Sequence, residues 1–549
     1  MRPMGERAWV VDDPTNDEFP IWTRGNVGEV FPAVVSPLTW SLFGPEAERG
    51  WRDAFGAFGA MKEPDYRGVF PALVGVFGGY CYLNVSLHRI LAVRTPGLTP
   101  PDMDRSIFGE SEAPAYEASK GDKDLLATLK ITRTVASTLF AKALPALAAD
   151  KAAVAAWVAR QPDPATADRA ALRATVDEFR GMFRGLFGNH ILTTFRATIP
   201  TGVLTDICTN KLGDPGLVVR LLGGIGDVES AEPARRLWAL SRLPAGSAEF
   251  DAALDAFRAE FGSRGPNEWE GSSPTWGTEP ALVMAAVEAM RRADESHSPD
   301  TQRAALEADR AAATADARGR LKGMARRQFD TALKSAAVLS QGRERSKTTV
   351  IRALHAYRLA VLELDRRVAD DPGAAFMVTI DELDRYLDDP ASFATEIAER
   401  RARRDELAAL EPPFVFVGTQ PDPSTWTTRA GLPQDKCATG AVLKGIAGCP
   451  GVARGRARVV LDPADPRGLG PGDVLVAPIT DPSWTPLFIP AEAVVVDVGA
   501  QMSHAVIVSR ELGIPCAVSV VGATRSIPDG ALVEVDGTNG TVTVLETPA

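Results

Sequence analysis

The sequence predicts an α+β multidomain protein, with a large, mainly α-helical part followed by a small β-rich α/β domain. Three segments are rich in Ala, Leu, Arg and Glu and place apolar residues at helical spacing: 120–190, 280–340 and 345–410. Beyond residue 440, short Val/Ile-rich runs alternate with Gly and Pro turns, which is typical of strands. The intervening stretch is rich in Pro, Thr, Gly and Asp, as linkers are. We therefore expect a helical domain over 1–410, a linker over 411–440 and a small domain over 441–549.

The composition is that of a globular enzyme. The chain has 549 residues, 45% hydrophobic and 24% charged, which is enough to bury the cores of two or more domains. A net charge of −11 and the lack of a basic run argue against nucleic acid as a partner. No apolar stretch is long enough to span a bilayer, so we expect no membrane partner. The five cysteines are scattered without a Cys-x-x-Cys pair, which predicts a cytoplasmic location and no metal site.

One histidine in the small domain lies where a strand is predicted to turn into a helix. The run Val494–Val496 predicts a buried strand, and Ser503 is a plausible N-cap for a helix that ends before Gly513. His504 then lies in the first helical turn, beside free backbone N–H groups and the positive end of the helix dipole. Both features stabilise anions, so a phosphoryl group on this imidazole would be held there.

The surrounding sequence carries a resemblance to a known family. The run Gly499-Ala-Gln-Met-Ser-His-Ala-Val-Ile-Val-Ser-Arg-Glu-Leu-Gly-Ile-Pro515 resembles the phosphohistidine segment of the PEP-utilising enzymes, although Ala500 replaces a glycine of the family pattern. The resemblance extends over about 440–546, the swivelling domain of that family. It implies that His504 carries a phosphoryl group. It also implies that the phosphohistidine is supported by Ser503, Gln501 and Arg510.

Three segments of the helical part resemble the acceptor-substrate domain of rifampicin phosphotransferase and its relatives. The first follows an Asn-x-Gly-Glu-Val pattern and continues to Trp40; the second follows Gly-x-Arg-x-Pro-x-Glu; the third is Arg-Glu-x-x-Lys. By this resemblance, we assign acceptor binding to Asn26, Glu29, Arg264 and Glu268. The last two could instead form a structural ion pair. Ser263 departs from the larger residue that relatives often have.

The third segment, residues 343–347, also has a physical argument of its own. We predict that it opens a helix, on which residues four apart project from one face. The guanidinium of Arg343 and the ammonium of Lys347 can therefore converge on one site. Phosphoryl transfer needs such cations, because charge spreads over the equatorial oxygens of the transferring group. We assign catalysis to His504, Arg343 and Lys347; the alternative for the two cations is an exposed, solvated pair.

Other candidate residues have structural interpretations that compete with functional ones. The remaining histidines are most simply structural, although His190 or His355 could face a pocket and act as a base. The aromatic residues of 77–82, with Trp22 and Trp40, could line an aromatic pocket or form plain core.

These observations predict a phosphotransferase component that works by covalent relay. We find no phosphate-cradling glycine loop in the sequence, so no tightly bound cofactor is expected, and ATP and Mg²⁺ are expected on a separate ATP-grasp subunit. The resemblance implies a small hydroxylated aromatic acceptor, as in the two-subunit phenylphosphate synthases. The alternatives are a component that phosphorylates a rifampicin-like antibiotic, and a degenerate or regulatory phosphocarrier.

Overall fold

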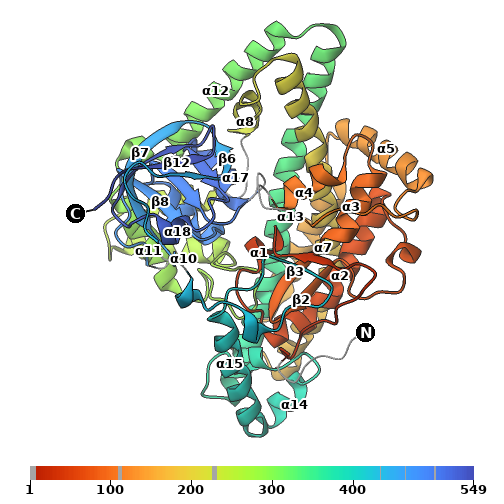
Figure 1. Ribbon diagram of the computed structural model, residues 1–549. Coiled ribbons are helices and arrows are strands. Elements are labelled where there is room, and N and C mark those ends of the chain that lie inside the picture. The colour runs from red at the N-terminus through yellow and green to blue at the C-terminus, as the bar shows by residue number, and fades with distance from the viewer. Residues whose placement is uncertain are drawn as a thin grey trace.

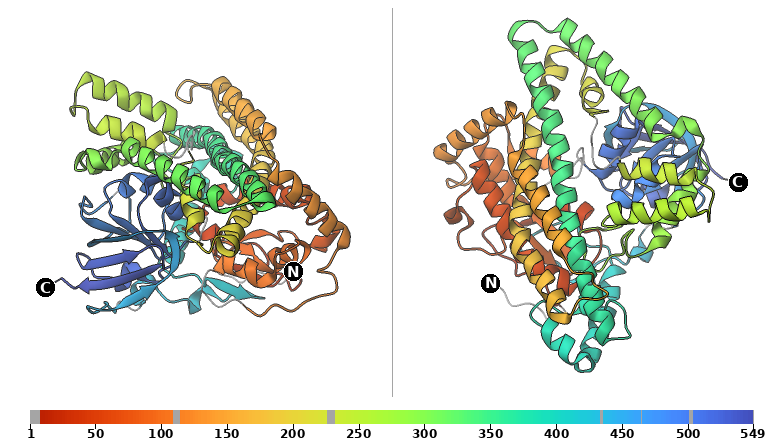
Figure 2. Two further views of the ribbon diagram at one scale, coloured as in Figure 1. Left: turned by 90° about the horizontal axis from the view of Figure 1, so that it is seen from above. Right: turned by 180° about the vertical axis from the view of Figure 1, so that it is seen from behind.

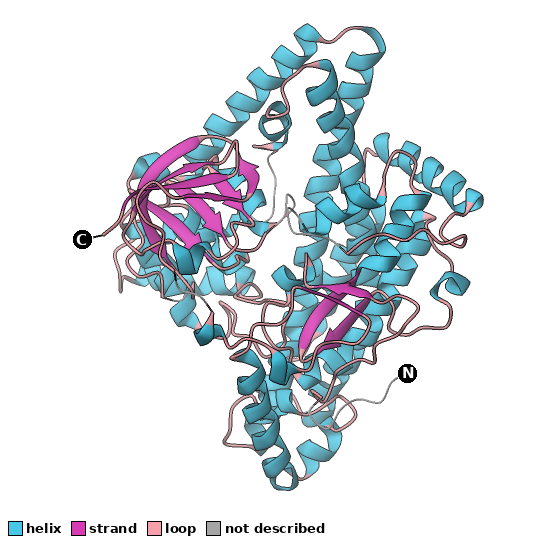
Figure 3. Ribbon diagram, viewed as in Figure 1, coloured by secondary structure: helices cyan, strands magenta, loops and turns pink. Residues whose placement is uncertain are grey.

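The architecture consists of a large helical part and a small β-rich domain that lie side by side (Figure 1). The structure is a computed structural model and describes residues 8–108, 114–225, 232–432, 435–463, 465–499 and 503–548. Figure 3 shows the strands in two separate groups within a mainly helical molecule, as the sequence predicts. The α+β class and the order of the two parts are thereby confirmed.

Three long helices form the frame of the helical part. Helix α7 packs along both α2 and α13, and all three are visible from behind in Figure 2. In α13, apolar side chains that are fully buried recur at helical spacing, among them Ile351, Leu354 and Val361. The helices of the described chain are α1 (Val27–Val30), α2 (Pro37–Phe58), α3 (Val85–Arg94), α4 (Pro100–Phe108), α5 (Leu125–Leu139), α6 (Pro145–Arg160), α7 (Arg169–Asp206), α8 (Leu217–Leu222), α9 (Glu232–Ser241), α10 (Ala248–Phe261), α11 (Pro280–Arg291), α12 (Pro299–Arg320), α13 (Gly323–Val368), α14 (Leu383–Asp388), α15 (Ala394–Ala408), α16 (Thr485–Phe488), α17 (His504–Leu512) and α18 (Ala523–Ser526).

A small sheet closes the helical part near its N-terminus. Its order is β2-β3-β1-β4, from β1 (Ile21–Thr23), β2 (Val74–Phe77), β3 (Tyr80–Asn84) and β4 (Val415–Val417). Strand β4 comes from the segment predicted as linker and pairs antiparallel with β1. The first part of the predicted linker is thus fixed to the helical part. Val415–Val417 forms the edge strand of the small sheet, and Trp426 is only 9% exposed.

The small domain is built on an eight-stranded mixed sheet of order β5-β12-β11-β7-β8-β9-β10-β6. The neighbours β7, β8, β9 and β10 are parallel, and the other pairs are antiparallel. The central strands β8 and β9 are Val-rich and buried, as parallel strands covered on both faces require. The strands are β5 (Val442–Lys444), β6 (Ile446–Cys449), β7 (Val452–Val459), β8 (Asp473–Ala477), β9 (Ala493–Val496), β10 (Cys516–Val518), β11 (Leu532–Asp536) and β12 (Thr541–Glu546).

One hydrophobic core is continuous between the two parts of the molecule. It joins apolar residues of α9, α10 and α11 to apolar residues of the small domain, including Phe488 of α16 and Val506 of α17. Helix α12 also packs on α17. These contacts pack α16 and α17 against the helical part.

One helix boundary differs from the prediction. Residues 343–347 do not open a helix but lie in the middle of α13, which is 46 residues long. The sequence signal was misread because the preceding Ala/Arg-rich stretch carries no break from Gly323 onward that would separate two helices. The i, i+4 argument is unaffected, since both residues still lie on one helix.

None of the described helices combines the length and the apolar character that a membrane crossing requires.

The half-buried carboxyl of Asp13, next to the small sheet, makes a testable contribution to stability. Burial raises the pKa of Asp13 to about 7. The folded protein therefore holds a proton that the unfolded chain releases above about pH 4. Stability is expected to fall by up to ~1.4 kcal/mol per pH unit as the pH rises from 4 to 7, and this loss ends above pH 7.

The variant Asp13→Asn should weaken this pH dependence in urea unfolding, because its amide oxygen can still accept from the Trp40 indole and the Val76 N–H. The exposed Asp370 provides the control Asp370→Asn, which should leave the slope unchanged. An unaltered slope in Asp13→Asn would contradict the assignment.

Candidate active site between the two domains

His504 is the first residue of α17, the first helix after β9 along the chain. Ser503 occupies the N-cap in an extended conformation, and Gly513 ends the helix with a left-handed backbone (φ 69°) that suits glycine. The predicted strand, helix start and helix stop are thus confirmed. Gln501, predicted to support the phosphohistidine, lies outside the described residues.

Two threonine hydroxyls flank the imidazole of His504. Thr480 Oγ1 lies 3.1 Å from Nδ1, and Thr485 Oγ1 lies 3.3 Å from Nε2. The Phe488 ring packs edge-on against the imidazole with centroids 5.9 Å apart. These contacts fix the ring plane, so one nitrogen donates to a threonine and the other keeps its lone pair.

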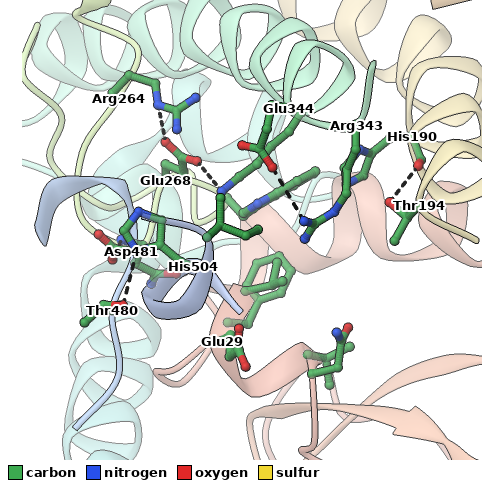
Figure 4. A pocket seen from close by; sticks show the side chains of 18 of the residues that line it. Glu29, His190, Thr194, Arg264, Glu268, Arg343, Glu344, Thr480, Asp481 and His504 are labelled. Atoms are coloured by element: carbon green, nitrogen blue, oxygen red, sulfur yellow. Dashed lines mark hydrogen bonds and ion pairs between the residues drawn. The ribbon is translucent and has the colours of Figure 1, made fainter. Parts of the chain in front are cut away.

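Cations of the helical part surround this imidazole (Figure 4). The carboxylate of Glu268, 1% exposed, binds both Lys347 Nζ at 3.1 Å and Arg264 Nε at 3.0 Å. Arg343 Nη1 lies 3.6 Å from Glu344 Oε1. The ion pair considered as the alternative for Arg264 and Glu268 therefore exists, and it extends to Lys347.

The electrostatic environment keeps His504 uncharged. Burial is the largest cause that lowers its pKa well below the ordinary value, followed by the positive charges of Lys347, Arg264 and Arg343. A neutral imidazole has the lone pair that a phosphoryl group must bond, and the cations around it favour the arrival of an anion. The site is therefore suited to hold phosphate on nitrogen.

The loop that carries Arg264 and Glu268 is held by a buried arginine. Arg358 of α13 is 0% exposed and donates to the carbonyl oxygens of Glu268, Glu270 and Gly271 at 2.9–3.0 Å. The Glu270 carboxylate in turn accepts from the Ser36 and Thr39 hydroxyls at the start of α2, both at 2.6 Å. The loop is thus tied to two of the frame helices, which fixes the cations in space.

A cavity connects these groups to an aromatic wall. The cavity has a volume of about 170 Å³. Every residue predicted to catalyse or to bind the acceptor borders it: His504, Arg343, Lys347, Arg264, Glu268, Asn26 and Glu29. Its apolar lining includes Trp40, Trp51, Phe183, Phe187, Trp269 and Trp276. Residues from distant parts of the sequence are thereby brought to one space.

The small domain is latched to the helical part beside this cavity. Asp481 Oδ2 accepts a hydrogen bond of 2.8 Å from the backbone N–H of Asn267. Burial is the largest cause that raises the pKa of Asp481, and the nearby Glu268 raises it further. The latch places the Thr480 hydroxyl and His504 next to the cation loop.

Several predicted residues lie away from the cavity. Arg510 is in the last turn of α17, where its Nε donates to the Gly448 carbonyl at 3.2 Å, so the structure does not bring it to His504. The Ser503 hydroxyl is buried and does not border the cavity. His355 is likewise not among the lining residues, whereas His190 is.

The predicted aromatic pocket is only partly correct. Trp22, Phe77 and Tyr82 pack on one another and on Phe416 in the core of the small sheet. Trp40 does line the cavity. Trp40 lies on helix α2, not on the sheet. Within β3, Cys81 borders the cavity whereas Tyr80 and Tyr82 do not, because successive residues of a strand point to opposite faces.

Sequence reasoning missed several residues that shape the site. Thr480 and Thr485 received no role from the sequence, and Asn267 is one of the variable positions of the Gly-x-Arg-x-Pro-x-Glu pattern. A hydroxyl or a backbone N–H that contacts a site residue from a distant part of the chain leaves no recognisable spacing pattern in the sequence. Only the folded chain shows the contact.

Within the described ranges, no group of three His, Cys, Asp or Glu side chains is arranged to hold a metal ion.

Comparisons with known proteins agree with this geometry. Residues 469–540 match the family described as PEP-utilising enzyme, mobile domain, and residues 239–344 match the rifampicin phosphotransferase fourth domain. An uncharacterised protein of Mycobacterium tuberculosis is 36% identical over 339 residues, which cover 61% of this chain and 34% of the relative. The prodigiosin synthesizing transferase PigC of Serratia marcescens is 32% identical over 315 residues, 55% of this chain and 34% of that protein.

A rifampicin phosphotransferase of Streptomyces sviceus is 28% identical over 351 residues, 60% of this chain and 37% of that enzyme. The chain therefore spans about a third of the length of these relatives. The first family match contains Thr480 and His504, and the second contains Arg264, Glu268 and Arg343.

The threonine contact predicts a tautomer that can be measured. If Thr480 accepts from Nδ1–H, Nε2 carries the lone pair. Thr480→Val removes this acceptor and should give a mixture of tautomers, whereas Thr480→Ser should keep one. Nitrogen-15 NMR of the histidine ring reads the tautomer directly. A single, unchanged tautomer in Thr480→Val would show that this hydroxyl does not set it.

Proposed function

Because the chain carries a PEP-utilising mobile domain and is homologous to rifampicin phosphotransferases, we propose that it is a phosphotransferase component with a phosphohistidine intermediate. His504 carries the phosphoryl group, and the hydroxyl of a small organic acceptor receives it. The observation that supports this proposal best is the shared cavity, in which His504 of one domain meets Arg343, Lys347 and Arg264 of the other.

The transfer step follows from the groups around the cavity. An acceptor hydroxyl oxygen attacks phosphorus while the bond from phosphorus to His504 Nε2 breaks. The electron pair of that bond returns to the imidazole, and the hydroxyl proton leaves to the surrounding solvent or phosphate. Lys347, Arg264 and Arg343 stabilise the charge on the equatorial oxygens. The low pKa of His504 makes the neutral imidazole a good leaving group.

Loading of His504 requires a phosphoryl donor. We propose that ATP and Mg²⁺ bind a separate ATP-grasp subunit, as in two-subunit relatives. The donor nucleotide must reach His504, which in this arrangement is half-buried against the helical part. The small domain therefore swivels away for loading and returns for transfer, about the connection that follows Trp426.

The acceptor we favour is a phenol, because the cavity joins aromatic walls to the cation cluster. A rifampicin-like antibiotic is the second candidate, and the observation in its favour is the match of residues 239–344 to the rifampicin phosphotransferase fourth domain. A degenerate phosphocarrier is the third. The neutral imidazole and the cations around it favour turnover.

Loss of the carrier should abolish the relay. Wild-type protein and the His504→Ala variant are each incubated with phosphoramidate, a small phosphoryl donor to histidine, or with ATP and a candidate ATP-grasp subunit. Wild type should gain an acid-labile, alkali-stable phosphate, and His504→Ala should gain none at this position. Mass mapping of the phosphopeptide gives the answer. His355→Ala is the control, because His355 does not border the cavity. Turnover that survives in His504→Ala would exclude the relay.

Loss of the cations should separate loading from transfer. Arg343→Ala and Lys347→Ala should still be loaded but should discharge to phenol about two to three orders of magnitude more slowly. Arg343→Lys should not recover fully, since the planar guanidinium fork is lost. Single-turnover discharge of preloaded protein measures this step. Discharge at the wild-type rate in both alanine variants would remove the cation cluster from the mechanism.

A further inference from the structure

A second polar group borders the cavity and has no role in the proposed transfer. His190 lies on α7, and its Nδ1 is 2.9 Å from the hydroxyl oxygen of Ser346. That hydroxyl donates its only proton to the Arg343 carbonyl oxygen, 2.9 Å away. Ser346 can therefore only accept from His190, which places the ring proton on Nδ1. Nε2 is left as a hydrogen-bond acceptor.

The Nε2 acceptor is available to whatever occupies the cavity. No residue in the described part of the chain is hydrogen-bonded to it, and the His190 side chain belongs to the cavity wall. The ring lies 6.0 Å from Trp269 in a tilted arrangement, and Trp269 is also edge-on to Phe187 at 6.0 Å. Neighbouring aromatic rings thus fix the position of this acceptor.

His190 and His504 lie at different ends of the cavity. Figure 4 shows His504 on one side and His190 on the other, with the Arg343 guanidinium between them. The positive charges of Arg343 and Lys347 act on both imidazoles, which agrees with a position between the two. An acceptor molecule whose hydroxyl is beside His504 and that extends past the Arg343 guanidinium therefore reaches His190.

Electrostatics make His190 a hydrogen-bond acceptor rather than a general base. Burial, then Arg343 and Lys347, lower its pKa to about 3. A nitrogen of this basicity takes up a proton poorly at neutral pH. It remains uncharged and can accept from an O–H or N–H group of a ligand.

We propose that His190 Nε2 forms a recognition subsite for a second hydrogen-bond donor on the acceptor substrate. The inference rests on the proposed function, because that function places the reacting hydroxyl at His504. The substrate class is then narrower than a simple phenol: an aromatic molecule with the reacting hydroxyl at one end and an O–H or N–H donor at the other. A ligand that buried Nε2 without a donor would leave this acceptor unpaired, which disfavours it.

Two pairs of probes test the subsite by calorimetry on the full chain. Each pair differs only in whether the far group donates: hydroquinone against 4-methoxyphenol, and 4,4′-biphenol against 4′-methoxybiphenyl-4-ol. In at least one pair, the donor-bearing member should bind wild type about tenfold more tightly, as a hydrogen bond to a buried acceptor predicts. Failure of all four probes to bind, or equal affinities within both pairs, would overturn the proposal.

Two substitutions at the same position separate recognition from packing. His190→Asn keeps a hydrogen-bond donor near Ser346 but removes the acceptor at the Nε2 position. The affinities of the two probes in each pair should then agree within about twofold. His190→Gln restores an amide oxygen near the Nε2 position and should keep most of the preference. His355→Asn is the control, since His355 is a half-buried histidine that does not border the cavity. A preference that persists in His190→Asn would contradict the subsite.

The binding test and the transfer test fail independently. Tighter binding of the probes with a hydrogen-bond donor, without any phosphorylation, would support the subsite and overturn the phosphotransferase proposal. Equal discharge of phosphohistidine to both members of each pair, with no difference in binding, would leave the relay standing and overturn the subsite.

Discussion

The structure depends on one electrostatic constraint: an uncharged imidazole must be held among cations that belong to a different domain. His504 comes from α17 of the small domain, whereas Lys347, Arg264 and Arg343 come from α13 and the 262–277 loop. Such a cluster repels itself unless carboxylates neutralise part of it, and Glu268 does so by binding two of its members. A phosphoryl group adds the negative charge that the remaining positive potential favours.

Rigid supports around the cluster explain why so much of the helical part is needed. Arg358 and Glu270 tie the cation loop to α13 and α2 through buried, charge-assisted hydrogen bonds. The small domain, by contrast, meets the helical part through an apolar surface on α9, α10 and α11 and through the hydrogen bond from Asn267 to Asp481. Transfer by positioned charges tolerates little displacement. A fixed frame with a movable carrier meets both demands of a two-step relay.

Local patterns in the sequence predicted much of the fold and of the candidate site. Contacts between residues that are far apart in the sequence could not be predicted in this way. The strand, cap and helix around His504 could be predicted because each depends on neighbouring residues, as could the shared face of Arg343 and Lys347. Strand β4 within the expected linker could not, because its partner β1 is almost 400 residues earlier. The Thr480 contact and the His190 tautomer depend on tertiary hydrogen bonds that have no spacing signal.

The central claim is that one small domain alternates between loading and transfer, and a reversible lock tests it most directly. Asn267→Cys with Asp481→Cys, in a Cys437→Ser background, places one thiol on each of the two residues that the latch hydrogen bond joins. Protein loaded first and then oxidised should still discharge phosphate to acceptor, while protein oxidised first should not be loaded until the disulfide is reduced. Asp481→Cys alone controls for loss of the latch itself, and Asn267→Cys alone controls for the new thiol, since it keeps the backbone N–H of the latch. Loading of the oxidised protein at the rate of the reduced one would contradict the account.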